Sequence, residues 1–157
     1  MRIVFMLLLC GASFSAYAQA NDPFNSPADI SPAGGITSGN TSAATAQTGE
    51  AGVSSYAYGK SVWFRLITPT DLRINAKTEG SNYDTTLALY RGANISEARL
   101  VAGNDDASGA VLWSEIDVSI QSGTYWLAID GYLGAGGNYN LAWQTISMPI
   151  MLALPAG

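Results

Sequence analysis

Short apolar segments separated by turn-forming residues run through most of the chain. Leu72, Ile74 and Ala76 alternate with polar residues, which is the pattern of a strand with one face in a core and the other in water. Residues 124–130 are apolar almost throughout, which predicts a strand buried on both faces. No stretch has the periodicity of an amphipathic helix. The pattern therefore predicts an all-β fold, a jelly-roll-like antiparallel β-sandwich of about seven or eight short strands.

The stretch from Gly80 to Gly92 organises the prediction, because it begins as a turn and continues as a strand. Leu87 and Leu89 fall on one face of this strand. Asp84 stands where the loop becomes the strand, a position where a carboxylate is held rigidly and still meets solvent. The predicted strands cover residues 36–41, 61–67, 72–77, 85–90, 97–103, 111–120, 124–130 and 139–143.

Residues 1–18 have the pattern of a secretory signal peptide. Arg2 supplies the positive charge, residues 3–9 form an apolar run, and residues 16–18 form a cleavage site of the small-x-small type. Cleavage after residue 18 is preferred, with residues 18–20 as a second register. Cys10 is interpreted as part of the discarded signal. Lipid attachment there stays open, although Leu9 is not the small residue that normally precedes a lipid-bearing cysteine.

The rest of the chain divides into three parts. Residues 19–35 contain prolines and turn formers and predict an extended leader, and residues 36–146 contain the β-sandwich. Residues 147–157 form an apolar tail that is too short to span a bilayer, which predicts no membrane span. The role of the tail, and whether the chain continues beyond it, stay open.

Charge and residue inventory exclude several functions. The net charge is −5 with only 7 Lys and Arg, so no basic stripe exists and nucleic-acid binding is not expected. The chain has no His, and its one Cys lies in the predicted signal, which removes His and Cys chemistry and disulfides from the mature chain. We therefore expect no enzyme. The alternative is a small carboxylate-dependent glycosidase using Asp84 with Asp130, or Asp105 with Glu115, but no spacing supports either pair.

Oxygen-bearing side chains at strand ends suggest a calcium site. Calcium prefers carboxylate and carbonyl oxygens from flexible loops. The alternative is that these Asn and Asp residues only form Asx-turns between strands. The candidate ligands are Asp105, Asp106 and Asn104 in one turn, with Asp84, Glu50 and Asp22 from other segments.

Aromatic side chains suggest a binding surface. Trp113 and Tyr132 stand near Gly-rich turns and are the candidate ligand-binding residues, although a structural role is the alternative for both. Trp63, Trp126 and Trp143 lie in apolar strands and are expected in the core. These residues predict an extracellular protein or polysaccharide as partner, with a carbohydrate-binding module as one alternative. The oligomeric state stays open.

Seven segments form an ordered series along the chain: residues 21–24, 39–50, 61–65, 80–85, 101–106, 123–132 and 136–141. Taken in order, they resemble the bacterial pre-peptidase C-terminal domain family. The resemblance covers nearly all of residues 21–145 and implies a secreted jelly-roll-like β-sandwich, often appended to exported proteases and other enzymes. Relatives include the collagen-binding modules of bacterial collagenases, some of which bind calcium. We expect a secreted or periplasmic, non-catalytic module that binds a partner or assists an exported enzyme.

Overall fold

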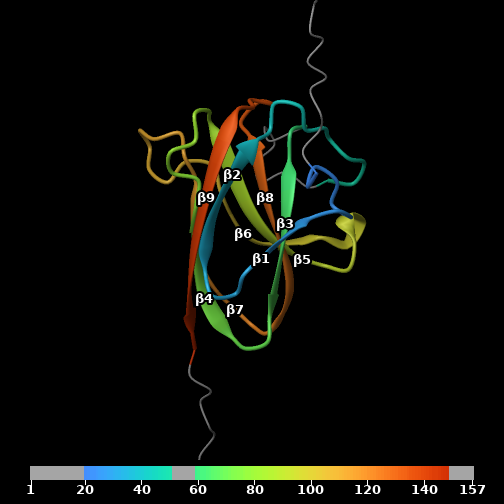
Figure 1. The fold of residues 1–157 in the computed structure, drawn as a ribbon, viewed down its shortest axis with the longest axis vertical. Coiled ribbons are helices and arrows are strands. Elements are labelled where there is room, and N and C mark those ends of the chain that lie inside the picture. The colour runs from blue at the N-terminus through green and yellow to red at the C-terminus, as the bar shows by residue number, and fades with distance from the viewer. Residues whose placement is uncertain (1–19, 51–58, 149–157) are drawn as a thin grey trace, which may run out of the picture.

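Two β-sheets face each other in the computed structural model, which describes residues 20–50 and 59–148 of the chain (Figure 1). The predicted signal peptide and most of the apolar tail lie outside the described residues. One sheet has the strand order β1-β3-β8-β5-β6 and the other β2-β9-β4-β7. The predicted all-β sandwich is confirmed. Its strands are β1 (Ala28–Ile30), β2 (Gly35–Asn40), β3 (Val62–Thr68), β4 (Leu72–Lys77), β5 (Thr85–Arg91), β6 (Arg99–Asn104), β7 (Glu115–Ile120), β8 (Gly123–Gly131) and β9 (Asn138–Ser147), with one 3-10 turn at Ile95–Glu97.

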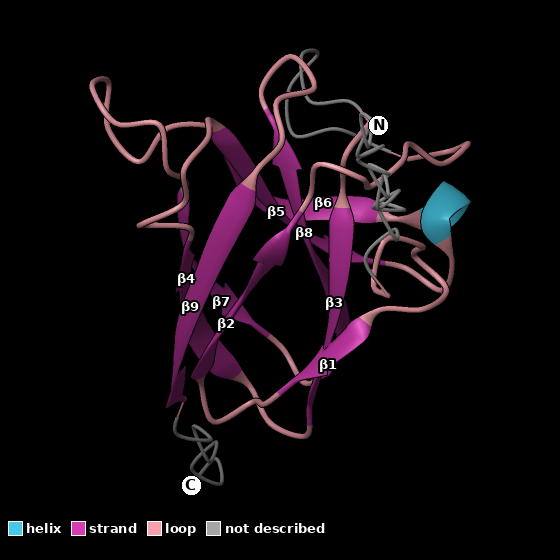
Figure 2. Ribbon diagram, turned by 45° about the horizontal axis from the view of Figure 1, so that its top comes forward, coloured by secondary structure: helices cyan, strands magenta, loops and turns pink. Residues whose placement is uncertain are grey.

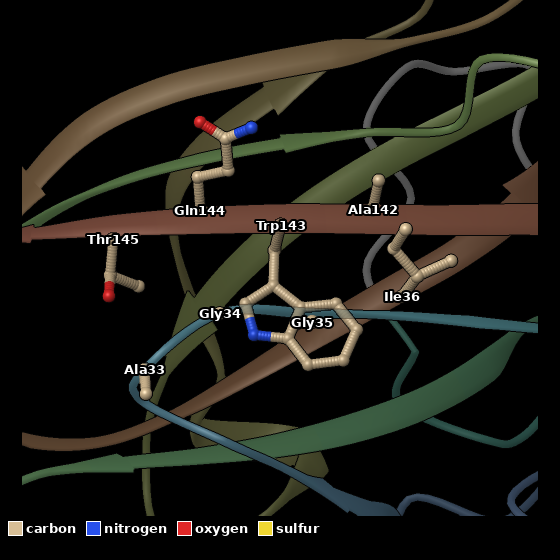
Figure 3. A pocket seen from close by; sticks show the side chains of 8 residues that line it. All are labelled: Ala33, Gly34, Gly35, Ile36, Ala142, Trp143, Gln144 and Thr145. Atoms are coloured by element: carbon tan, nitrogen blue, oxygen red, sulfur yellow. The ribbon is translucent and has the colours of Figure 1, made fainter.

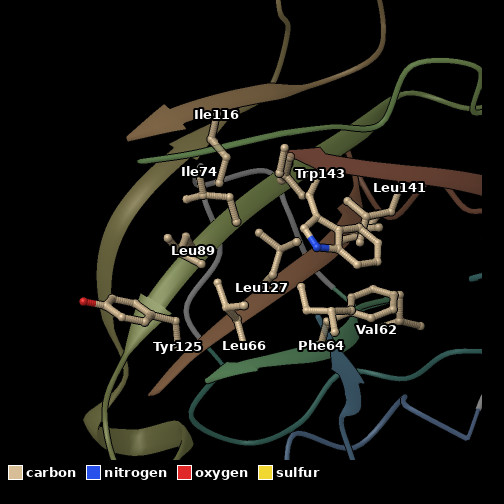
Figure 4. Close-up of a cluster of buried hydrophobic side chains, with 14 of the residues drawn as sticks. Val62, Phe64, Leu66, Ile74, Leu89, Ile116, Tyr125, Leu127, Leu141 and Trp143 are labelled. Atoms are coloured by element: carbon tan, nitrogen blue, oxygen red, sulfur yellow. The ribbon is translucent and has the colours of Figure 1, made fainter. Parts of the chain in front are cut away.

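The main core lies between the two sheets (Figure 4). Leu66, Leu89 and Leu127 point inward from the five-stranded sheet, and Ile74 and Leu141 point inward from the four-stranded sheet. Each of the five is 0% exposed. Burial of such a side chain contributes about 1.5–3 kcal/mol to the stability of the fold. The alternating pattern therefore determines which face of each strand points into the core.

The leader segment is part of the sandwich. β1 pairs in parallel with β3, and the backbone N–H of Trp63 donates to the carbonyl of Asn21 at 2.8 Å. Phe24 is only 3% exposed and stacks on Trp126 at a ring-centroid distance of 5.2 Å. The sandwich therefore begins at least as early as Asn21, before the predicted boundary at residue 36. The physical reason is that aromatic residues on the outside of the five-stranded sheet need a cover.

The outer faces of the two sheets differ as a result. A second apolar cluster covers the five-stranded sheet, which leaves β5 buried on both faces. The outer face of the four-stranded sheet stays open and polar, with Arg73 and Asp117 joined by two hydrogen bonds of 2.6 and 2.7 Å. Among the described residues no helix is long and apolar enough to cross a bilayer. The second cluster consists of Phe24, Trp63, Ala88, Tyr90 and Ala128, with Ile95, Ala98 and Trp126 packed against it.

One predicted strand is shorter than expected. β7 starts at Glu115, whereas the prediction began at residue 111. Residues 105–114 instead form a loop that turns back on the start of β5, because the N–H of Thr85 donates to the carbonyl of Leu112 at 3.0 Å. Asn104, predicted in the turn, is the last residue of β6.

Candidate functional site

Several loops gather at one end of the sandwich, at the top of Figure 1 and again in Figure 2. β4, β6 and β8 end there, and β5, β7 and β9 begin there, as the antiparallel pairing requires. We define the acidic loop end as Asp84, Asp105 and Asp106 together with the loops at 105–114 and 132–137. It holds three of the six predicted metal ligands and both predicted ligand-binding aromatics, and a fourth predicted ligand, Asn104, directly precedes its first loop.

Asp84 occupies the centre of the acidic loop end because two loops are bonded to the start of β5. The N–H of Tyr132 donates to the carbonyl of Asp84 at 3.0 Å. On the next residue, the N–H of Thr85 donates to the carbonyl of Leu112 at 3.0 Å. The loops at 105–114 and 132–137 are therefore held beside consecutive residues of one strand.

Three buried hydroxyl groups fix the ends of β4, β5 and β7 to one another. Thr78, Thr85 and Ser114 are each 0% exposed. The hydroxyls of Thr78 and Thr85 lie 2.6 Å apart, and the N–H of Ser114 donates to Thr78 Oγ1 at 2.8 Å. Ser114 Oγ also lies 2.6 Å from the carbonyl oxygen of Asp105. This cluster sets the position of the Asp105 backbone without using its carboxylate.

The carboxylates at this end lack hydrogen-bond donors. Asp84 Oδ1 and Asp105 Oδ1 are buried and accept no hydrogen bond from the described residues. Burial raises the pKa of Asp84, and the nearby charges of Asp105 and Asp106 raise it further. Burial, followed by the charge of Asp106, also raises the pKa of Asp105. The three side chains thus feel one another's charge, and a cation placed among them would relieve the repulsion.

The carboxylates of the described residues do not form a preformed metal site. Within residues 20–50 and 59–148, no group of three or more acidic side chains is arranged to hold a metal ion. Asn104 is used structurally, since its Nδ2 donates to the carbonyl of Asp106 at 2.9 Å and its Oδ1 accepts from the N–H of Glu115 at 2.8 Å. For Asn104 the turn-forming interpretation therefore fits the contacts better than the ligand interpretation.

The other two predicted ligands, Asp22 and Glu50, lie in a separate place, on the outer side of the five-stranded sheet. The carboxylate of Asp22 accepts the N–H of Thr45 at 2.9 Å and its hydroxyl at 3.0 Å. The side chain of Gln47 bridges the same segments, since its Nε2 donates to the carbonyl of Asp22 at 3.0 Å and its Oε1 accepts from Phe24 N–H at 3.0 Å. Asp22 therefore holds the leader to the loop after β2.

Glu50 has a buried carboxylate close to Asp130. Its Oε2 accepts the N–H of Gln47 at 2.9 Å, while Oε1 is buried without a hydrogen bond of good geometry. Burial raises the pKa of Glu50, the neighbouring Ser61 hydroxyl and Gln47 amide oppose the rise, and the charges of Asp130 and Asp22 add to it. We call Asp22, Glu50 and Asp130 the covered acidic site.

Asp130 is the carboxylate of the covered acidic site that lies at the end of β8, and it is 8% exposed. Its Oδ1 accepts the N–H of Lys60 at 3.0 Å and the N–H of Gly131 at 2.7 Å. Burial raises its pKa, and these backbone donors and the charge of Lys60 work against that rise. Asp130 therefore has a structural role, because its carboxylate holds the backbone at Lys60 and at Gly131.

The predicted aromatic residues are half-buried, and their neighbours are the exposed ones. Trp113 lies under Lys77, whose Nζ is 5.9 Å from the ring centroid, and Tyr132 is also half-buried. Leu112 is 59% exposed and Leu133 is 69% exposed, and both were missed by the sequence reasoning. A large apolar residue placed inside a Gly-rich loop was the available signal for Leu133.

A groove lies elsewhere on the sandwich, over the start of β2 (Figure 3). It has a volume of about 440 Å³, and Trp143 lies at its floor beneath Gly34 and Gly35. A Cβ at Gly35 would come within 2.6 Å of the indole, so this close packing requires glycine. None of the lining residues is titratable, and the groove therefore offers shape without acid–base or metal chemistry. The lining residues are Ala33, Gly34, Gly35, Ile36, Ala142, Trp143, Gln144 and Thr145.

Comparison with known proteins identifies the fold. No family model and no curated protein matches the chain. Among solved structures, the pre-peptidase C-terminal domain of a collagenase from Bacillus anthracis is similar, with 13% identity, a TM-score of 0.47, and coverage of 75% of this chain and 94% of that domain. That domain belongs to the family that the sequence motifs resemble.

A second solved structure has a higher TM-score. PliG of Aeromonas hydrophila, a periplasmic lysozyme inhibitor of g-type lysozyme, has 15% identity, a TM-score of 0.52, and coverage of 76% of this chain and 96% of PliG. At this level of identity the likeness concerns the fold.

Proposed function

We propose that this chain is an exported, non-catalytic β-sandwich module that binds an extracellular protein and is stabilised by calcium at its acidic loop end. The observation that carries the proposal is the pair of buried, donor-free oxygens, Asp84 Oδ1 and Asp105 Oδ1, held between two fixed loops. Such atoms are costly unless a cation or a partner's donor completes them.

The inventory of reactive groups supports a non-catalytic role. The whole chain has no His, and its single Cys lies in the predicted signal peptide. Asp130, one half of the glycosidase pair considered from the sequence, is 8% exposed and is occupied by backbone donors. A general acid or nucleophile must instead meet its substrate in a cleft.

Calcium is the cation that suits the acidic loop end. It accepts carboxylate, carbonyl and water ligands in flexible geometry, and Asp84, Asp105 and Asp106 supply carboxylates from two segments. Because these carboxylates are not already arranged around a metal position, their side chains have to rearrange on binding. An affinity in the weak extracellular range, with Kd of about 10⁻⁴–10⁻³ M, follows from that cost.

A protein partner is supported by the likeness in fold to PliG, whose name describes a lysozyme inhibitor in the periplasm. The same likeness supports an exported location, in agreement with the signal pattern at residues 1–18. A polysaccharide is the second candidate, favoured by the polar outer face of the four-stranded sheet. A hollow of about 280 Å³ there is lined by Arg73, Asn75, Asp117, Gln144 and Ile146.

A binding panel tests the proposal. The chain from residue 19 onward would be immobilised and exposed to goose-type lysozyme, hen egg-white lysozyme, soluble collagen and purified peptidoglycan, each in millimolar calcium and in chelator. We expect saturable binding to at least one of the proteins, no binding to peptidoglycan, and no hydrolysis of peptide, ester or glycoside substrates. Binding to peptidoglycan alone would favour the polysaccharide candidate, and turnover abolished by Asp84→Asn or Asp130→Asn would show an enzyme.

A further inference from the structure

We propose that Leu112 and Leu133, the leucine pair, insert into a protein partner whose surface offers an apolar pocket bordered by basic residues. The proposal rests on the proposed function and names the surface and the partner chemistry that would serve it. Leu112 belongs to the loop between β6 and β7, and Leu133 to the loop between β8 and β9.

The loops that carry the two leucines lie on opposite sides of the first residues of β5. The carbonyl of Leu112 accepts from Thr85, and Tyr132, next to Leu133, donates to Asp84. Both side chains are nevertheless more than half exposed, at 59% and 69%. The backbone that carries each leucine is thus fixed to the β5 strand, while the apolar side chain is left in water. Large apolar side chains on fixed loops are typical of contact residues in protein interfaces.

Leu133 has a strained backbone in addition to its exposure. Its φ is 50°, and it is the one non-glycine residue with positive φ among the described residues. Left-handed backbone costs an L-residue about 1–2 kcal/mol, which glycine would avoid. The loop holds this geometry through the bonds from Gly134 N–H to the Gly131 carbonyl at 3.2 Å and from Ala135 N–H to the Tyr132 carbonyl at 2.9 Å. A costly conformation that exposes an apolar side chain indicates a functional position.

The charge around the leucine pair defines the partner. Lys77 is paired with Glu79, and the side chain of Lys60 lies against Gly136 of the 132–137 loop, near Asp130. Because the acidic side chains outnumber these two lysines, the surface stays negative even with one calcium ion bound. It would repel anionic lipid and attract a protein with basic residues around its pocket. The acidic side chains on these segments are Glu79, Asp84, Asp105, Asp106 and Glu115.

Other exposed apolar side chains provide matched controls. Ile36 is 81% exposed on β2, and Ile146 is 66% exposed on β9. Both project from the outer face of the four-stranded sheet, where regular strand geometry alone explains their position. They are as apolar and as exposed as the leucine pair, but they lie away from the acidic loop end.

The experiment compares three forms of the chain from residue 19 onward by surface plasmon resonance. They are the wild type, the Leu112→Ser/Leu133→Gly variant, and the Ile36→Ser/Ile146→Ser control. The probes are the two lysozymes, as basic proteins, soluble collagen, and vesicles of phosphatidylglycerol. Glycine at position 133 removes the side chain and tolerates φ of 50°. Circular dichroism and the Tm of each form check folding.

We expect the leucine variant to lose at least about tenfold in affinity for a lysozyme that the wild type binds, the loss that removal of a central apolar contact gives. The control should stay within about twofold, and added salt should weaken wild-type binding. A loss confined to the isoleucine control, or equal affinity in all three forms, would overturn the inference and leave the proposed function standing. Binding to collagen without binding to either lysozyme, or binding to the vesicles, would do the same. Failure of the wild type to bind any probe would reject both.

Discussion

The covered acidic site and the acidic loop end use similar residues in opposite ways. Asp130 is almost fully enclosed, and its oxygen accepts two backbone N–H groups of 2.7 and 3.0 Å. Asp84 is half-buried, and its Oδ1 accepts nothing from the described residues. The fold supplies hydrogen-bond donors to the first carboxylate and none to Oδ1 of the second. The supply of backbone donors, more than burial or pKa, separates the structural acid Asp130 from Asp84, the acid that we propose as a calcium ligand, since burial raises the pKa of both.

The aromatic cover of the five-stranded sheet gives the largest expected effect. Phe24 is buried between Trp63 and Trp126, with ring-centroid distances of 5.0 and 5.2 Å. We expect Phe24→Ala to lower the free energy of unfolding by about 3–5 kcal/mol, the usual cost of removing a buried aromatic side chain. Urea denaturation measures it, and Asn25→Ala, on an exposed neighbour, is the control. A change below about 1 kcal/mol would show that the leader is dispensable and would break the comparison.

Asp130 itself should come next. Asp130→Ala leaves the N–H groups of Lys60 and Gly131 without their acceptor, and we expect a loss of about 3 kcal/mol. Asp130→Asn keeps an acceptor oxygen in place and should lose clearly less. Denaturant unfolding of the three proteins decides the matter. Equal losses for alanine and asparagine would mean that the charge, and not the acceptor geometry, matters.

Calcium should act on the acidic loop end alone. At a free calcium concentration of about 100 times Kd, binding to the folded state adds about 2.7 kcal/mol, so the Tm should rise by several degrees over that in chelator. Asp105→Ala/Asp106→Ala should abolish the rise and leave the Tm in chelator unchanged or slightly higher. Glu50→Gln, in the covered acidic site, should keep the rise. Identical wild-type melting curves with calcium and with chelator would rule out the calcium site.

Strain at Leu133 should give a smaller effect of opposite sign. Leu133→Gly relieves the left-handed backbone, offset in part by the greater freedom of glycine when unfolded, so we expect stabilisation by about 0.5–1 kcal/mol. Leu133→Ala keeps the strained φ and should show no such gain. Thermal melts in chelator compare the two variants. If alanine stabilises as much as glycine, the gain comes from removing an exposed side chain and not from the backbone.

The smallest effect concerns pH. The pKa values of Asp84 and Asp105 lie above the unfolded value of 3.8, so the folded state binds protons more strongly. Their contribution to stability is full below that value and is lost as the pH rises through the folded pKa. Asp84→Asn/Asp105→Asn should therefore flatten the decline in Tm measured in chelator from about pH 4 upward. Because these groups are partly exposed, solvent screening keeps the effect small. An unchanged slope would mean that neither burial nor repulsion among the carboxylates disfavours their charged forms in the folded state.

The sequence predicted the sandwich well, because alternating positions such as Leu72, Ile74 and Ala76 report their own burial directly. It placed residues 19–35 outside the sandwich, because nothing local in Phe24 indicates that aromatic residues far along the chain, such as Trp126, need covering. Contacts of that kind depend on how the sheets twist and which strands become neighbours.

The candidate site was predicted in part. Asp84 and the Asp105–Asp106 turn do come close, because the ends of adjacent strands meet. Asp22 and Glu50 lie elsewhere, because the path of the loop that carries an acidic residue decides on which face of the sheet its side chain lies. Trp113 and Tyr132 are half-buried, and the exposed apolar residues of the same loops are their neighbours Leu112 and Leu133. Adjacent residues of a loop can differ between half-buried and exposed, and the sequence pattern alone does not show which of the two is exposed.

The buried hydroxyls of Thr78, Thr85 and Ser114 have a kinetic consequence. They hold the ends of three strands together beneath the acidic loop end. A partner that docks there would meet loops already in place, and little chain ordering would oppose the encounter. Variants of the leucine pair should then change the residence time of the complex while its rate of formation stays nearly constant. Ser114→Ala, which removes no contact group, should instead slow formation, because the loops would have to be ordered at each encounter.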